Sequence, residues 1–114
     1  MANAFKRRTV NATTGGVLLL ASDVGANTEI VVIGLLASNK SAGAETVTIE
    51  LVFDTNNDNV DESFSWITNA PLPVGSSLSC MENKLVLVTG DNIRATARTN
   101  STIDVTISYL EITP

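Results

Sequence analysis

The stretch Glu29–Asp54 decides the fold of this chain. Its first part, Glu29-Ile-Val-Val-Ile-Gly-Leu-Leu-Ala-Ser-Asn39, is an almost unbroken apolar run, which Lys40-Ser-Ala-Gly-Ala44 interrupts. The second part, Glu45-Thr-Val-Thr-Ile-Glu-Leu-Val-Phe-Asp54, alternates apolar and polar residues. A continuous apolar run is typical of a strand buried on both faces, and alternation is typical of a strand with one buried face. The pattern therefore predicts two partner strands joined by a short turn, at the centre of the fold.

The rest of the chain carries further strand-like segments separated by turn residues. They lie at 17–22, 60–68, 76–82, 85–89, 92–99 and 102–112. Their spacing of about 8–12 residues is typical of β-sandwiches and barrels. Pro71 and Pro73 cannot both lie in a central strand, so residues 69–75 are predicted to cross between two sheets. We expect an all-β fold, a single antiparallel β-sandwich domain over residues 1–114, jelly-roll or immunoglobulin-like, with roughly eight strands.

Side-chain direction follows from the alternation within these segments. Phe64 and Trp66 share a face of their strand, and this face is predicted to point into the core. In the last segment the apolar phase slips by one residue after Tyr109, towards Leu110 and Ile112. A β-bulge, or contact of both faces with protein, would explain that slip.

Composition narrows the class of protein. The chain has 114 residues, 44% of them hydrophobic, and a net charge of −5, which argues against a general nucleic-acid binder. The single cysteine, Cys80, excludes an internal disulfide framework. No apolar run approaches the roughly 18 residues of a membrane span, and no signal peptide is recognisable. We therefore expect a soluble protein that is made in the cytoplasm.

The sequence lacks the residues that most enzymes use. It contains no histidine, which removes the usual general base, the histidine-dependent triads and most zinc sites. No glycine-rich phosphate loop precedes a helix. We expect neither an enzyme nor a bound cofactor.

One segment resembles a metal loop. Asp54, Asn56 and Asp58 match the first half of a calcium-binding loop in ligand type and spacing. However, Asn59 stands where such loops have glycine, and Ser65 stands where they have a bidentate glutamate. The favoured interpretation is an acidic loop whose Asn and Asp residues suit a turn, and a weak calcium site is the alternative.

The first ten residues carry a basic triplet beside one aromatic residue, namely Phe5, Lys6, Arg7 and Arg8. They form either a flexible N-terminal arm or an edge strand. The plainer interpretation is a solvated basic terminus. The sharper one makes these four residues a protein interface that docks on an acidic neighbour, such as another copy of the chain.

Four segments together resemble a known group of proteins. They are Met1-Ala-Asn-Ala-Phe-Lys6, Val31-Val-Ile-Gly-Leu-Leu-Ala-Ser-Asn39, Asn69-Ala-Pro-Leu-Pro-Val-Gly-Ser-Ser-Leu78 and Leu110-Glu-Ile-Thr113. In this order they resemble small virion structural proteins of tailed bacteriophages, including phages of cyanobacteria. The resemblance spans nearly the whole chain.

The resemblance implies a virion subunit, assembled in the host cytoplasm, that acts as a capsid decoration (cement) protein. Its partners would be the major capsid protein or other virion proteins, with neither nucleic acid nor membrane bound. A homo-oligomer is expected, with a trimer favoured at three-fold positions. The alternatives are a neck, tail or baseplate component of the same particle and, from a different class, a carbohydrate- or calcium-binding module for a host surface.

Overall fold

The computed structural model describes residues 2–53, 62–81 and 84–113, and the regular structure in these ranges is entirely β-strand. Nine strands are present there. Their bounds are β1 Ala2–Asn11, β2 Val17–Leu18, β3 Glu29–Asn39, β4 Glu45–Phe53, β5 Glu62–Leu72, β6 Ser77–Ser79, β7 Leu85–Leu87, β8 Asn92–Ala97 and β9 Ile103–Thr113.

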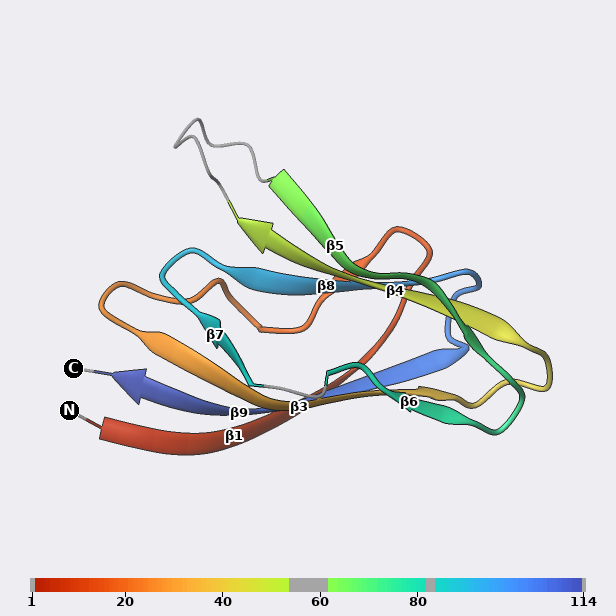
Figure 1. Ribbon diagram of the computed structural model, residues 1–114, viewed down its shortest axis with the longest axis horizontal. Coiled ribbons are helices and arrows are strands. Elements are labelled where there is room, and N and C mark those ends of the chain that lie inside the picture. The colour runs from red at the N-terminus through yellow and green to blue at the C-terminus, as the bar shows by residue number, and fades with distance from the viewer. Residues whose placement is uncertain (1, 54–61, 82–83, 114) are drawn as a thin grey trace.

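The strands form two sheets that face each other (Figure 1). The first sheet has the order β1-β9-β3-β6, with β7 also paired to β3, and the second has the order β2-β8-β4-β5. The paired strands run antiparallel. The predicted β-sandwich is confirmed, and this strand order is that of a jelly roll, in which most consecutive strands lie in opposite sheets.

The predicted pairing of 29–39 with 45–54 is wrong. β3 lies between β9 and the β6 and β7 strands in one sheet, whereas β4 lies between β8 and β5 in the other. Residues 40–44 therefore cross between the sheets instead of closing a hairpin, and so does the Asn100-Ser101 turn between β8 and β9. Periodicity identifies the face that a strand buries, but two strands can bury their apolar faces against each other across a core as well as side by side.

Burial on both faces of β3 is also wrong, since its outward side chains Ile33 and Leu36 are exposed. Residues 69–75 fit their prediction better. β5 belongs to one sheet and β6 to the other, so the chain crosses after Leu72. Pro71 lies within β5, which is an edge strand, where a residue without an N–H is tolerated.

The core fills the space between the sheets. Leu35 and Ile107 of the first sheet and Ile49 and Ile93 of the second are essentially buried. The predicted strand at 17–22 is shorter than expected: only Val17–Leu18 pair, with β8, and Leu19 enters the core from the following loop.

The bulge predicted for the last strand lies in its neighbour. Ile33 is the extra residue in β3, because Val32 pairs with Tyr109 and Gly34 pairs with Ser108. β9 itself continues without a break to Thr113, and from Ser108 onward its residues are half-buried. The phase slip after Tyr109 therefore reflects two partly covered faces, the second explanation considered for it.

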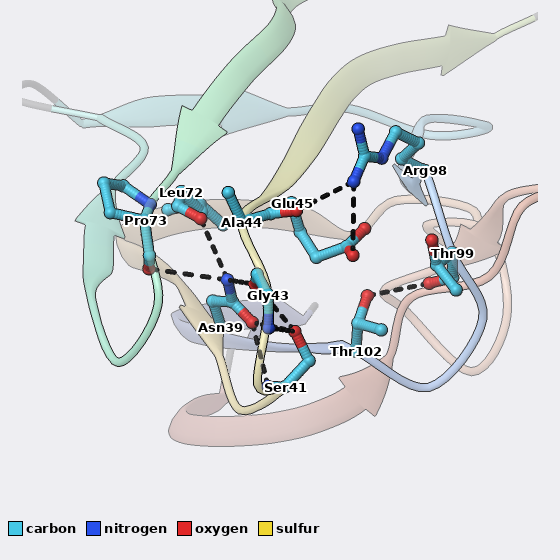
Figure 2. Close-up of polar contacts among 10 residues, drawn as sticks. All are labelled: Asn39, Ser41, Gly43, Ala44, Glu45, Leu72, Pro73, Arg98, Thr99 and Thr102. Atoms are coloured by element: carbon cyan, nitrogen blue, oxygen red, sulfur yellow. Dashed lines mark hydrogen bonds and ion pairs between the residues drawn. The ribbon is translucent and has the colours of Figure 1, made fainter.

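Asn39 fixes the crossover between β3 and β4 (Figure 2). Its buried side-chain amide donates hydrogen bonds to the carbonyl oxygens of Gly43, at 2.8 Å, and Leu72, at 2.9 Å. Its Oδ1 accepts hydrogen bonds from the backbone N–H and the hydroxyl of Ser41, at 2.9 and 2.8 Å. One side chain thus joins the 40–44 crossover to the end of β5.

Asp104 links β1, the outermost strand of the first sheet, to β9. Its pKa predicts how the stability of the protein depends on pH. Asn11 donates a 2.7 Å hydrogen bond to Asp104, and Lys40 forms a 3.1 Å ion pair with it. The Asn11 hydrogen bond, with Lys40 adding to it, lowers the pKa of Asp104 below its usual range. A lowered folded-state pKa gives stability above about pH 4 that is lost as the pH falls through that pKa.

We therefore expect the wild type to exceed Asp104→Asn in stability at neutral pH and to lose this advantage in acid. Urea unfolding of both proteins between roughly pH 2.5 and pH 7 measures the difference. A difference that does not change with pH would contradict this role of the carboxylate.

Candidate functional site: two apolar surfaces and an open edge

β1 is an open edge of the first sheet (Figure 1). Its ten residues pair with β9 along their whole length, and no described strand pairs with its other side. Of the two forms considered for the N-terminus, the structure has the edge strand. Such an edge presents unpaired backbone N–H and C=O groups, which can accept a further strand.

The four residues predicted as an interface alternate between the two faces of β1. Lys6 faces inward and forms a 2.8 Å ion pair with Glu111, and this hydrogen bond and charge raise the pKa of Lys6. Arg8 also faces inward and donates to the carbonyl oxygens of Leu18 and Leu19, at 3.4 and 2.7 Å. Phe5 and Arg7 face outward, and Phe5 is 79% exposed. Two of the three cations are therefore engaged within the chain.

The outward side of the first sheet carries an apolar surface. Val31 of β3 lies in register with Leu110 of β9 on one side and Val86 of β7 on the other. Ile33 and Leu36 extend this surface along β3, and both are exposed. We call these five residues the outer apolar face. Contiguous exposed apolar surface of this kind typically marks an interaction site.

A second apolar surface lies where the two sheets separate. At the end of β4 and β5 that rises away from the first sheet (Figure 1), a hollow of about 280 Å³ is lined mainly by Leu51, Phe64, Trp66 and Leu85. We call these four residues the apolar mouth. Phe64 also stacks on Phe53, with ring centroids 5.1 Å apart.

The prediction that Phe64 and Trp66 face a closed core is wrong. Phe64 pairs with Leu51 on the inward side of its sheet, but it is 49% exposed, and Trp66 is 37% exposed. Trp66 is the extra residue of β5 at a register shift, since Ile49 pairs with Ile67 and Glu50 pairs with Ser65. Of the short strand β7, Leu85–Leu87, only Leu85 lines the same hollow. Alternation in the sequence predicts the direction in which a side chain points. Whether other residues shield that side chain from solvent depends on strands elsewhere in the chain.

Three further features of the sequence are a possible calcium site, a single cysteine and the lack of a long apolar run. Asp54, Asn56 and Asp58 lie outside the described residues, and the described ranges contain no group of three potential metal-ligating side chains. Cys80 is buried, and its burial raises the pKa of the thiol, which suppresses the reactive thiolate. Among the described residues, no helix is long and apolar enough to span a membrane.

Comparisons with known proteins identify the fold. No protein-family model and no curated protein match the sequence. The chain is similar in structure to a subunit of the disulfide-linked pili of Bacillus endospore appendages, with 11% identity, a TM-score of 0.53, and 98% of this chain and 87% of the other covered.

Two structures of infectious bursal disease virus are also similar. The T13 viral particle matches with 14% identity and a TM-score of 0.56 over 96% of this chain. The Gt strain matches with 14% identity and a TM-score of 0.52, also over 96%. The chain spans only 30% and 32% of those viral polypeptides. The fold is therefore one that pilus and virus-particle proteins use, and none of these similarities is to a tailed-phage protein.

Proposed function

We propose that the chain is a structural subunit of a virion, and that it is a decoration (cement) protein which binds and stabilises the major capsid shell of a tailed phage. The observation that carries this proposal is the outer apolar face, which is built on β3, a strand flanked by partners on both sides. The shared fold with virus-particle and pilus proteins supports a role in assembly, and the resemblance noted in the sequence supports the phage. The proposal assigns no catalytic activity.

The energetics suit a subunit present in many copies. Fully burying one exposed Leu, Ile or Val side chain contributes about 1.5–3 kcal/mol, and docking must also offset the lost freedom of the free protein. The five residues of the outer apolar face are enough for a moderate contact per copy. Contacts repeated around a shell, or linked within an oligomer, raise the total through avidity.

A neck, tail or baseplate component of the same particle is the alternative location. The outer apolar face and the open β1 edge would bind neighbouring proteins equally well in the neck, tail or baseplate. The two locations differ in copy number, which cryo-electron microscopy of intact particles measures.

Re-decoration of shells tests the proposed docking face. Shells stripped of this chain are incubated with wild type or with Leu36→Asp, and bound protein is measured after sedimentation. Leu36→Asp is expected to bind at least about tenfold more weakly, because an unpaired carboxylate would be buried at an apolar contact. Val74→Asp is the matched control, since Val74 is an exposed residue outside the outer apolar face, in the β5–β6 crossover. Equal binding by the three proteins would contradict docking through this face.

One observation favours a second candidate, a carbohydrate-binding module. Trp66 and Phe64 are exposed beside a hollow, and aromatic side chains of this kind also stack on sugar rings. Because Trp66 is the only tryptophan, its fluorescence reports directly on this surface. A saturable change on titration with oligosaccharides of the host surface, without any binding to shells, would favour the module over the decoration protein.

A further inference from the structure

We propose that Phe5 of one copy inserts into the apolar mouth of a second copy, so that copies join head to tail. This contact rests on the proposed role as a repeating subunit and adds to it the surface through which the copies meet. It involves the outer apolar face only at its margin, where Phe5 lies opposite Leu110.

The two surfaces match as a projection and a hollow. Phe5 is the most exposed large apolar side chain in the described residues, at 79%. The mouth offers about 280 Å³ lined by an indole, a phenyl ring and two leucines. Aromatic pairs gain about 0.5–1.5 kcal/mol beyond the burial of their area. The residues that dominate binding at protein interfaces are often aromatic and fill well-packed pockets.

Charge favours this arrangement over a symmetric pairing of two β1 edges. Arg7 is exposed beside Phe5 and makes no hydrogen bond or ion pair with another described residue, and Lys6 and Arg8 flank it. A two-fold β1–β1 contact would set this triplet against itself, which is unfavourable. A head-to-tail contact between β1 of one copy and the mouth of the next keeps the two basic triplets apart.

The backbone edges support the same contact. β1, with ten residues, and β5, with eleven, are the two long strands at sheet edges, and each is paired on one side only within the described chain. The start of β1 lies in the first sheet, and the rising end of β4 and β5 lies in the second (Figure 1). A head-to-tail contact forms a closed ring or a filament.

Sedimentation velocity of the purified full chain tests the contact. The wild type is expected to assemble with rising concentration, and Trp66 emission should shift to shorter wavelength as Phe5 covers the mouth. Phe5→Ser and Trp66→Ser are each expected to weaken self-association at least about tenfold. Val74→Ser, which removes an exposed apolar residue elsewhere, should assemble like the wild type. Phe64→Ser is a second mouth variant, and circular dichroism establishes that each variant is folded.

Mixing the two variants identifies a head-to-tail contact. Phe5→Ser keeps an intact mouth and Trp66→Ser keeps an intact Phe5, so an equimolar mixture is expected to form 1:1 heterodimers, although each variant alone is monomeric. A wild type that stays monomeric up to about 100 μM, or mixtures that form no heterodimer, would overturn the inference. A monomeric chain that still re-decorates stripped shells would overturn this contact and leave the proposed function standing.

Discussion

Replacing Asn39 with alanine is expected to lower the free energy of unfolding by about 3 kcal/mol, since it removes hydrogen bonds to one buried and two partly buried backbone groups. The amide of Asn39 holds the carbonyl oxygens of Gly43 and Leu72, and its oxygen holds the N–H of Ser41 (Figure 2). Asn39 is 4% exposed, so water does not readily replace these partners. The crossover that sends the chain from one sheet to the other depends on this one side chain.

Asn100→Ala is the matched control for that substitution. Asn100 is an exposed turn residue, and its Oδ1 accepts one hydrogen bond, 2.7 Å from the N–H of Thr14. Its loss is expected to cost at most about 1 kcal/mol, because water can satisfy the freed group. Equilibrium urea unfolding of the two variants and the wild type gives both values. Equal destabilisation by the two substitutions would show that Asn39 does not fix the crossover.

Ile49→Ala is expected to destabilise the protein by about 3 kcal/mol, within the range of 2–5 kcal/mol seen for buried isoleucines. Ile49 is fully buried and lies in β4, where it pairs with Ala95 of β8. Because Ala95 has a small side chain and the backbones on both sides are held in ladders, the site cannot collapse around the missing atoms. A cavity therefore remains between the two sheets.

Ile33→Ala provides the comparison, with the same atoms removed from the other side of the sandwich. Ile33 is 46% exposed at the bulge in β3, and its truncation is expected to cost less than about 1 kcal/mol. Thermal or urea unfolding measures both changes. If Ile33→Ala were as costly as Ile49→Ala, the outward side of β3 would be covered in the isolated protein, and the outer apolar face would not be available for docking.

Periodicity in the sequence predicts most strands and the faces that they bury. Ile93, Ala95 and Ala97 occupy every second position of their strand and point into the core, and so do Ile103, Val105 and Ile107 of the last strand. Within one strand, the direction of each side chain depends only on local geometry, which the sequence carries directly.

The pairing of strands and the burial of their side chains depend on parts of the chain that are distant in sequence. The predictions of these two properties fail for β3, β4 and Trp66. The β3–β4 crossover has the turn residues of a hairpin, and only the buried Asn39 at the end of an apolar run hints at a different course. Trp66 is exposed at a bulge in β5, because Ile49 pairs with Ile67 and Glu50 pairs with Ser65. The basic triplet is only partly available to other proteins. Lys6 forms an ion pair with Glu111, and Arg8 donates a hydrogen bond to the Leu19 carbonyl oxygen, and no local sequence pattern predicts either contact.

Cryo-electron microscopy of intact particles that contain this chain tests the proposed role most directly. Density for the sandwich is predicted over the whole shell at local symmetry axes, with the outer apolar face against the major capsid protein and the Phe5–Arg8 segment against a neighbouring copy. Density confined to one vertex, to the tail or to the baseplate would contradict decoration and favour the alternative location. Absence of the chain from the particle would contradict a virion role altogether.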